Sequence, residues 1–86
     1  MFYVYILKSL KDKQTYIGST SDLERRIEEY NSGKVISTKP RLPMKLLYYE
    51  AYLSEKDARH REHNLKLKSR AFAQLKKRLE DTLKNV

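Results

Sequence analysis

Residues 3–30 read YVYILKSLKDKQTYIGSTSDLERRIEEY and contain two short apolar runs separated by a polar stretch. Aromatic and β-branched residues dominate residues 2–7 and, more briefly, residues 15–19, which predicts two strands. The connection between them is too short for a crossover, so the strands must be antiparallel. Alternation places Tyr3, Tyr5 and Leu7 on one face and Val4 and Ile6 on the other. Tyr5 and Tyr16 are therefore expected to be cross-strand or diagonal neighbours.

The segment that follows carries helix signals at both ends. Ser21-Asp22-Leu23-Glu24 fits a capping box, and Gly33 can supply a left-handed stop after about residue 32. The apolar stripe of this helix is formed by Leu23, Ile27 and Tyr30. Arg26 lies on the same side, one turn before Tyr30. An arginine bordering a face that packs on a sheet suggests a functional position, with an ordinary surface or salt-bridge arginine as the alternative. Gly18 is expected where strand passes into helix, a place that needs backbone freedom or close approach.

The rest of the chain predicts a loop, a strand and two helices. Residues 33–43 have no sustained period and hold both prolines, so a basic, mobile loop is expected. Residues 44–53 resume strand composition. A second capping signal at Ser54 opens a helix, and residues 69–84 predict a final helix with one apolar stripe.

Glu62 is the unusual residue of the second helix. It shares a face with Ala58 and Leu65, so a lone carboxylate falls in an apolar stripe. Burying an unpaired carboxylate costs several kcal/mol. Glu62 is therefore expected to have a cationic partner or to lie at a cleft. A structural ion pair with Arg26 or Arg59 is the alternative to a functional role.

Length and composition limit the possibilities. The chain has 86 residues, which predicts one domain over residues 1–86. It has no cysteine, so disulfides and cysteine-based zinc sites are excluded. No apolar run reaches about 18 residues and no leader-like segment is present, which predicts a cytoplasmic protein without a membrane partner.

Charge points to a polyanionic partner. Lys and Arg number 19 against 11 for Asp and Glu, a formal net charge of +8. Such an excess attracts nucleic acid, although a solubilising surface is the simpler alternative. The residues expected to contact a phosphate backbone are Ser19, Lys34, Lys39, Arg41, Lys45, Lys66, Lys68 and Arg70.

Phosphodiester hydrolysis needs a base near the attacking water, a cation at the phosphoryl oxygens and commonly a divalent metal. Phenol oxygens of Tyr5, Tyr16 and Tyr30, the guanidinium of Arg26 and the carboxylate of Glu62 suit these roles. One carboxylate can hold Mg²⁺, because the ion keeps several waters and takes oxygens from the substrate. An ordinary tyrosine pKa near 10 is the weak point of a phenol base.

The triplets Tyr3-Val4-Tyr5 and Tyr16-Ile17-Gly18, with Asp22 to Arg26 and Arg61 to Lys66, resemble the GIY-YIG nuclease domain. The chain is most similar to the small, single-domain bacterial members, which are related to the N-terminal domain of an excinuclease. The resemblance covers about residues 1–77 and implies a family core of that extent, with the C-terminal helix continuing to about residue 84. The fold implied is α+β, a three-stranded antiparallel sheet flanked by about three helices. The implied activity is metal-dependent cleavage of DNA, structure-directed in repair or recombination.

The resemblance also implies roles for single residues. Tyr5 matches the phenol placed at the attacking water, and Tyr16 matches a second phenol that competes for the role of base. Arg26 matches the ligand of the scissile phosphate, and Tyr30 matches the residue one turn later. Glu62 matches the ligand of one Mg²⁺ or Mn²⁺ ion.

Three features depart from the family pattern. Tyr3 stands in place of the first glycine, and Ser19 stands where excinuclease-type domains carry lysine. The asparagine that those domains carry well after the metal-binding glutamate is not evident in the corresponding region, Ala71 to Leu75. RNA is the alternative nucleic acid, and a targeting protein is a further expected partner. A nucleic-acid-binding module with a dormant site is the alternative function.

Overall fold

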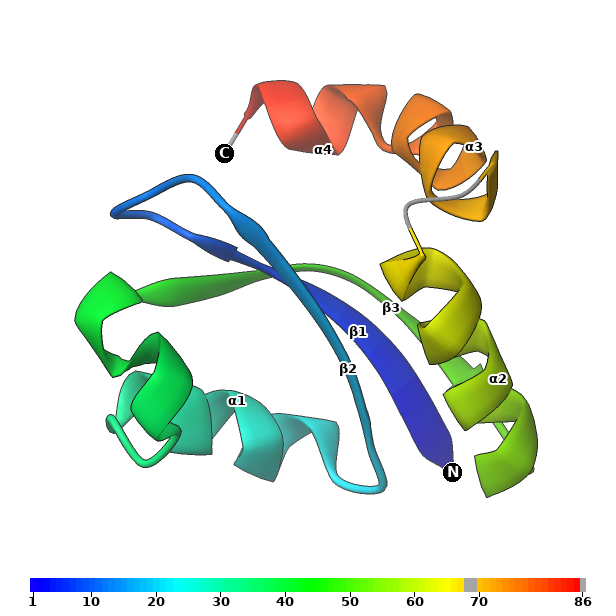
Figure 1. The fold of residues 1–86 in the computed structure, drawn as a ribbon, viewed down its shortest axis with the longest axis horizontal. Coiled ribbons are helices and arrows are strands. Elements are labelled where there is room, and N and C mark those ends of the chain that lie inside the picture. Colours follow the sequence, from blue (N-terminus) through cyan, green and yellow to red (C-terminus); the bar gives the residue numbers. More distant parts are fainter. Residues whose placement is uncertain (68–69, 86) are drawn as a thin grey trace.

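The structure is a computed structural model and describes residues 1–67 and 70–85. Its centre is a three-stranded antiparallel sheet in the order β2-β1-β3 (Figure 1). Strand β1 (Phe2–Ser9) pairs with β2 (Thr15–Thr20) on one side and with β3 (Met44–Tyr52) on the other. The predicted hairpin and third strand are confirmed. Both β2 and β3 are edge strands.

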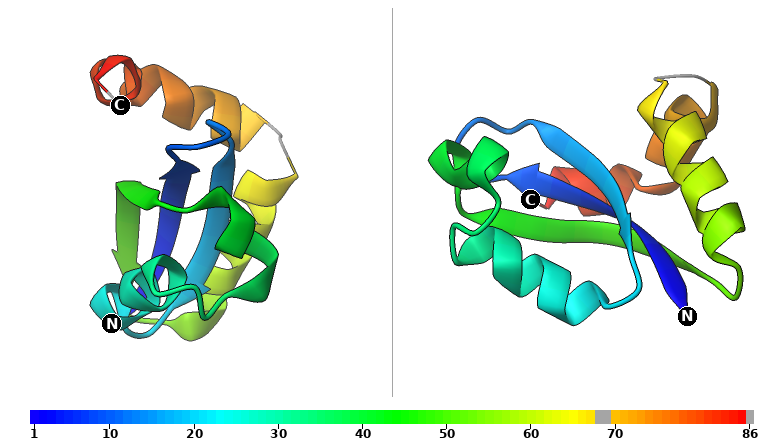
Figure 2. Two further views of the ribbon diagram at one scale, coloured as in Figure 1. Left: turned by 90° about the vertical axis from the view of Figure 1, so that its left-hand side faces the viewer. Right: turned by 60° about the horizontal axis from the view of Figure 1, so that its bottom comes forward.

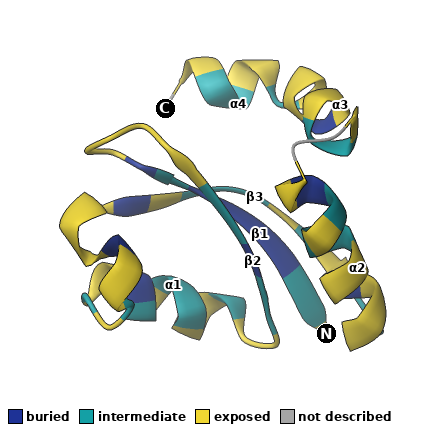
Figure 3. Cartoon of the chain, in the orientation of Figure 1, coloured by how far each residue is buried: buried dark blue, intermediate teal, exposed yellow. Residues whose placement is uncertain are grey.

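Side chains of β1 alternate between two cores, as the sequence predicts. Val4 and Ile6 pack with Ala58, Leu65 and Leu75 from the helices on one face. On the other face, Tyr5 and Leu7 pack with Tyr30 and Met44. Figure 3 shows the buried residues gathered along β1 and on the inward sides of the helices. The central strand therefore carries the core on both of its faces.

Helix α1 (Leu23–Asn31) begins one residue later than the capping box predicts. Its N-cap is Asp22, in extended conformation, and the Asp22 carboxylate accepts a hydrogen bond of 3.1 Å from the Arg25 backbone N–H. Asp and Ser are equally good caps, and here Asp22 has the extended conformation of an N-cap residue. Gly33 has φ +78, which confirms the predicted left-handed stop.

The predicted irregular loop contains a 3₁₀ helix, η1 (Ile36–Arg41). Thr38 is buried, and its backbone N–H and hydroxyl both bond to the Val35 carbonyl. At its end, Ser9 donates a hydrogen bond of 2.5 Å to the Arg41 carbonyl. The Asn31 amide bonds to both backbone groups of Met44. Contacts with distant residues therefore order a segment that has no period of its own.

Helix α2 (Glu55–Lys66) starts at the predicted cap, with the Ser54 hydroxyl accepting from the Asp57 N–H. The single final helix that the sequence predicts is instead two helices, α3 (Arg70–Arg78) and α4 (Glu80–Lys84). Leu79 leaves helical conformation, with φ −106 and ψ 18, and its N–H bonds to the Lys76 carbonyl. The break keeps Leu79 packed against the core shared with α2.

The elements form layers around the sheet. Helix α1 and η1 cover the face that carries Tyr5, whereas α2 and α3 cover the opposite face (Figure 2). No helix in the described part of the chain has the length and apolar character needed to cross a membrane. Strand β2 lies at the border between the two helical layers, so groups from both can meet at its edge.

Candidate active site

The side chain of Tyr5 occupies the space that Gly18 leaves open. The two residues are partners in the β1–β2 register. A Cβ on Gly18 would overlap the Tyr5 hydroxyl and lie 2.6 Å from Cζ. Gly18 lies inside β2 with no positive φ, so close approach and not backbone freedom explains the glycine.

Tyr5, Arg26 and Tyr30 form a compact cluster. The two phenol oxygens lie 3.1 Å apart, and Arg26 Nε donates to the Tyr5 oxygen over 3.5 Å. The guanidinium also lies over the Tyr30 ring, 4.9 Å from its centre. Arg26 Nη1 is 3.5 Å from a carboxylate oxygen of Glu29. These contacts hold the arginine in one orientation at the border of the core.

Tyr5 is a neutral phenol with little access to water. Its side chain is 2% exposed. Burial, followed by the hydrogen bond with Tyr30, raises the pKa of Tyr5 well above its ordinary value, although Arg26 opposes the change. Its geometry suits a group that orients Arg26 and Tyr30.

Tyr16 lies on the same face of the sheet, diagonal to Tyr5, and is half-buried. It lines a hollow of about 470 Å³ together with Tyr30, Arg41 and Lys66. Its hydroxyl donates to Asp12 Oδ2 over 3.3 Å, and Asp12 pairs with Arg41 at 3.0 Å. Burial raises the pKa of Tyr16, Arg41 lowers it, and Asp12 raises it further, with a net increase. Asp12 is a residue that sequence reasoning missed, because its ion pair with Arg41 joins positions far apart in the chain.

Glu62 has two donors on its carboxylate. Ser19 donates to Oε1 over 2.6 Å, and Lys66 Nζ is 2.5 Å from Oε2. Burial alone would raise the pKa of Glu62, but the hydrogen bonds from Lys66 and Ser19 outweigh it and lower the pKa below the ordinary value. The carboxylate is therefore ionised. It also lines a hollow of about 340 Å³, so Glu62 has both a cationic partner and a cleft. The partner is Lys66 and not Arg26 or Arg59, which pair with Glu29 and Glu55 on their own helices.

The chemistry of Glu62 fits a magnesium-type ion in a minimal way. Within residues 1–67 and 70–85, no group of three or more His, Cys, Asp or Glu side chains could hold a metal. A single ionised carboxylate facing an open hollow suits an ion that keeps most of its waters. His63 lines the same hollow, yet a hard ion prefers oxygen to imidazole.

The parts of the site meet along β2. Ser19 lines the hollow of Glu62 and also a second hollow that contains Arg26. Lys66 lines the hollow of Glu62 and that of Tyr16. In Figure 1, α1 and α2 lie on opposite sides of β2. The site is therefore a set of adjoining hollows around an edge strand, with contributions from both helical layers.

The residues expected to bind nucleic acid are found in different settings. Arg41 and Lys66 reach the hollow of Tyr16, and the Ser19 hydroxyl is turned toward Glu62. Lys34, Lys39, Lys45 and Arg70 lie at the surface, outside these hollows. Lys68 lies outside the described residues.

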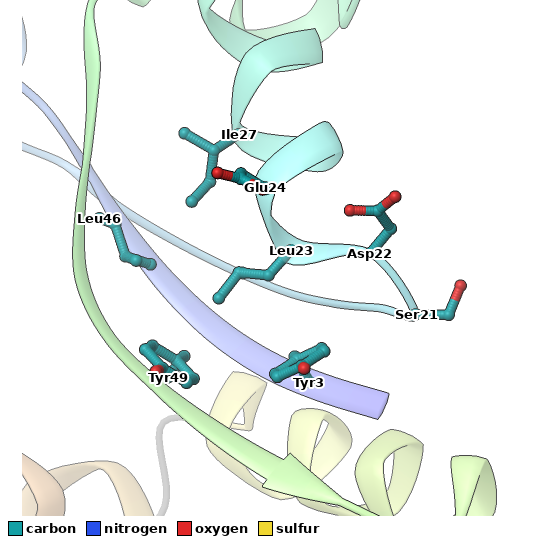
Figure 4. A pocket seen from close by; sticks show the side chains of 8 residues that line it. All are labelled: Tyr3, Ser21, Asp22, Leu23, Glu24, Ile27, Leu46 and Tyr49. Atoms are coloured by element: carbon teal, nitrogen blue, oxygen red, sulfur yellow. The ribbon is translucent and has the colours of Figure 1, made fainter. Parts of the chain in front are cut away.

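A further hollow, of about 400 Å³, lies between α1 and β3 and contains none of the predicted site residues (Figure 4). Tyr3 and Tyr49 meet edge to face at its base, with ring centres 5.9 Å apart. Asp22 and Glu24 line it from the start of α1. Carboxylates at this place disfavour a phosphate, so the hollow is not an extension of the site.

The helix that carries Glu62 is anchored to the sheet by a charged network. Arg61 makes two hydrogen bonds to Glu50, of 2.9 and 3.0 Å. The hydroxyls of Tyr48 and Tyr52 donate to the same carboxylate. Sequence reasoning missed this network, because Glu50 and Arg61 belong to different elements and no local spacing joins them.

A family model described as the GIY-YIG catalytic domain matches residues 1–79, and the chain belongs to this family. Family membership indicates DNA as the substrate class and a general dependence on divalent metal ions.

Individual relatives carry the name UPF0213. One from Clostridium perfringens is 43% identical over 67 residues, which cover 77% of this chain and 71% of that protein. Another, from Staphylococcus haemolyticus, is 44% identical over 69 residues, covering 79% and 83%. The solution NMR structure of a UPF0213 protein from Bacillus halodurans has a TM-score of 0.52 and 38% identity, covering 87% of this chain and 81% of that one. The predicted family and α+β fold class are confirmed.

Proposed function

We propose that this protein is a metal-dependent endonuclease that hydrolyses DNA phosphodiester bonds by attack of water. The arrangement along β2 carries the proposal. A guanidinium oriented by two phenols lies on one side of the edge strand, and an ionised carboxylate lies on the other. Hydrolysis needs a cation at the phosphoryl oxygens, a proton acceptor and commonly a divalent ion. The chain has a candidate for each part.

Arg26 is the proposed ligand of the scissile phosphate. Its side chain is 37% exposed, so a phosphate can reach it. The Tyr5 hydroxyl and the Tyr30 ring restrict its rotamers before any substrate binds. Little side-chain entropy is then lost on binding, and the planar guanidinium can contact two phosphate oxygens.

We assign the proton acceptor to Tyr16 and a positioning role to Tyr5. Tyr5 is buried and its hydroxyl is engaged, whereas Tyr16 faces an open hollow. The Tyr16 hydroxyl donates to Asp12. Hydrogen bonding from the Gln14 backbone lowers the pKa of Asp12 despite some desolvation, so this carboxylate is ionised and can accept a proton, although the lowered pKa makes it a weak base. When Tyr16 takes a proton from water, its own proton can pass to Asp12. The relay needs no free phenolate at neutral pH.

Glu62 is the proposed ligand of one Mg²⁺ or Mn²⁺ ion, with Ser19 fixing the orientation of the carboxylate. When bound, such an ion would offset charge on the phosphoryl and leaving oxygens. Lys34, Lys39, Arg41, Lys45 and Arg70 are the proposed contacts to the phosphate backbone, which is read without regard to sequence.

The proposal is tested by cleavage assays with Mg²⁺ or Mn²⁺ on branched, nicked, duplex and single-stranded DNA and on RNA. Branched and nicked substrates examine the proposed role in repair or recombination. Glu62→Ala and Arg26→Ala should each lower the cleavage rate by at least about 100-fold, the loss typical of a group that stabilises transition-state charge. DNA binding should persist in both. Tyr16→Phe should slow cleavage more than Tyr5→Phe.

Matched controls come from exposed positions of α2. Lys56→Ala removes an exposed cation and Glu55→Ala removes an exposed carboxylate; both should cleave normally. Retained cleavage by folded Glu62→Ala would overturn the metal assignment. Binding without cleavage of any substrate would favour the alternative of a nucleic-acid-binding module.

A further inference from the structure

Lys66 forms an ion pair with Glu62, the carboxylate proposed to hold the metal. Glu62 and Lys66 are one turn apart on α2, in the order that suits an ion pair along a helix. Lys66 Nζ lies 2.5 Å from Glu62 Oε2. The glutamate side chain is 19% exposed and the lysine side chain is 54% exposed. The pair is thus a largely buried acceptor closed by a cation that is free to move toward solvent.

The second oxygen of Glu62 is also engaged, since Ser19 donates to Oε1 over 2.6 Å. A divalent ion must therefore displace a donor. A hydroxyl can rotate and still offer a lone pair, but an ammonium has only donors and repels a second cation. Lys66 is the group that must leave.

The structure gives the released ammonium a place to go. Lys66 lines the hollow of Glu62 and also the hollow that holds Tyr16, Tyr30 and Arg41. Its flexible stem of four carbons can swing between the two without moving the backbone. In the second hollow, the ammonium would lie beside Arg41, where only an added anion such as phosphate makes two neighbouring cations favourable.

We propose that Lys66 is a built-in competitor for the cation site of Glu62, and that binding of a divalent ion transfers it to the hollow of Tyr16 as a phosphate ligand. This inference rests on the proposed metal role of Glu62. It makes the two events reciprocal: whatever frees Lys66 strengthens metal binding, and metal binding frees Lys66.

The first test measures Mn²⁺ affinity by electron paramagnetic resonance, without any nucleic acid. Lys66→Met should lower the dissociation constant by about threefold to fivefold, the effect of removing an occupant held by a partly exposed ion pair. Lys56→Met is the control, because it removes one exposed charge from the same helix and should leave the affinity unchanged. Circular dichroism confirms that both variants are folded.

The second test follows the lysine itself. Reductive methylation with ¹³C keeps the charge of each lysine and gives it an NMR signal, and Lys66→Arg identifies the signal of Lys66. Titration with Mg²⁺ should shift that signal in the unchanged protein and not in Glu62→Gln. The Lys56 signal should stay in place in both.

Equal Mn²⁺ affinities of Lys66→Met and the unchanged protein would overturn the inference, and so would absence of Mn²⁺ binding by both. A Lys66 NMR signal whose chemical shift does not change under saturating Mg²⁺ would also overturn the inference. These readouts are separate from catalysis. Tighter Mn²⁺ binding by Lys66→Met with no cleavage of any substrate would support the inference and reject the proposed nuclease function. Cleavage that depends on Glu62, together with equal Mn²⁺ affinities of Lys66→Met and the unchanged protein, would support the nuclease and reject the inference.

Discussion

At the scale of single residues, the site depends on the absence of a Cβ atom at Gly18. Tyr5 crosses β2 at Gly18, and this crossing brings its hydroxyl to Tyr30 and Arg26. The Tyr5 ring cannot move aside easily, because it is 2% exposed and packed in the core. Only glycine at position 18 leaves room for the Tyr5 hydroxyl, and this hydroxyl in turn contacts Arg26.

Gly18→Ala should destabilise the protein by about 1–3 kcal/mol, the usual cost of forcing extra atoms into a packed core. Urea unfolding measures the change. In a Tyr5→Leu background, which removes the atoms that a Cβ would meet, the same substitution should cost much less. An equal cost in both backgrounds would mean that contact with Tyr5 is not the cause.

At the scale of elements, the position of α2 depends on β3. Arg61 and Glu50 form the link, and their side chains are only 27% and 17% exposed. Burial by itself would raise the pKa of Glu50, but hydrogen bonds from Arg61, Tyr52 and Tyr48 lower it below the ordinary 4.5. The carboxylate is thus stabilised in its charged form. Because Glu62 follows Arg61 directly, this link also positions the proposed metal ligand.

Glu50→Gln should lower the free energy of unfolding by about 2–3 kcal/mol at neutral pH, since it weakens charge-assisted hydrogen bonds to a half-buried arginine. The folded-state pKa is depressed, so this contribution is complete above pH 4.5 and is lost as pH falls through the lower folded value. Urea midpoints between about pH 3 and pH 7 should show the two proteins converging in acid. Glu28→Gln, at an exposed position of α1, should leave the midpoint unchanged. A constant gap across the pH range would contradict the assignment.

At the scale of the whole molecule, a net charge of +8 is spread unevenly. Residues 31–48 contain four basic residues and no acidic one. Lys45 belongs to this stretch and lies opposite Lys8 in the β1–β3 register, so two basic residues share this end of the sheet. A phosphate backbone is attracted to such a concentration of positive charge.

Binding of DNA should therefore weaken steeply with salt. Lys45→Ala and Arg70→Ala should each reduce the slope of log affinity against log salt by about 0.9 for duplex and about 0.7 for single strands. Fluorescence anisotropy between about 50 and 200 mM salt measures the slope. Lys56→Ala should leave it unchanged. Unaltered slopes in the first two variants would place the backbone elsewhere on the surface.

The features of the fold that could be predicted from the sequence are those that depend on local patterns along the chain. Alternation assigned Val4, Ile6, Tyr5 and Leu7 to the correct faces, because each strand residue faces one of only two directions. The stop at Gly33 depends on one φ angle. The break at Leu79 was missed because the apolar period continues through it, and in the structure Leu79 packs against the core shared with α2. The pair of Glu62 and Lys66 was missed although its spacing of four carries the signal.

The sequence by itself determined the strand faces, the hairpin, the helix signals and the family, since these depend on neighbours along the chain. Only the tertiary structure decided which groups touch. Ser19 meets Glu62 across 43 positions of sequence, and Tyr5 meets Tyr30 across 25. Burial was also decided only by the tertiary structure, which places Tyr5 in the core and leaves Tyr16 half-buried. Contacts of this kind follow from the way the sheet brings α1 and α2 to one edge strand, and no local spacing encodes that geometry.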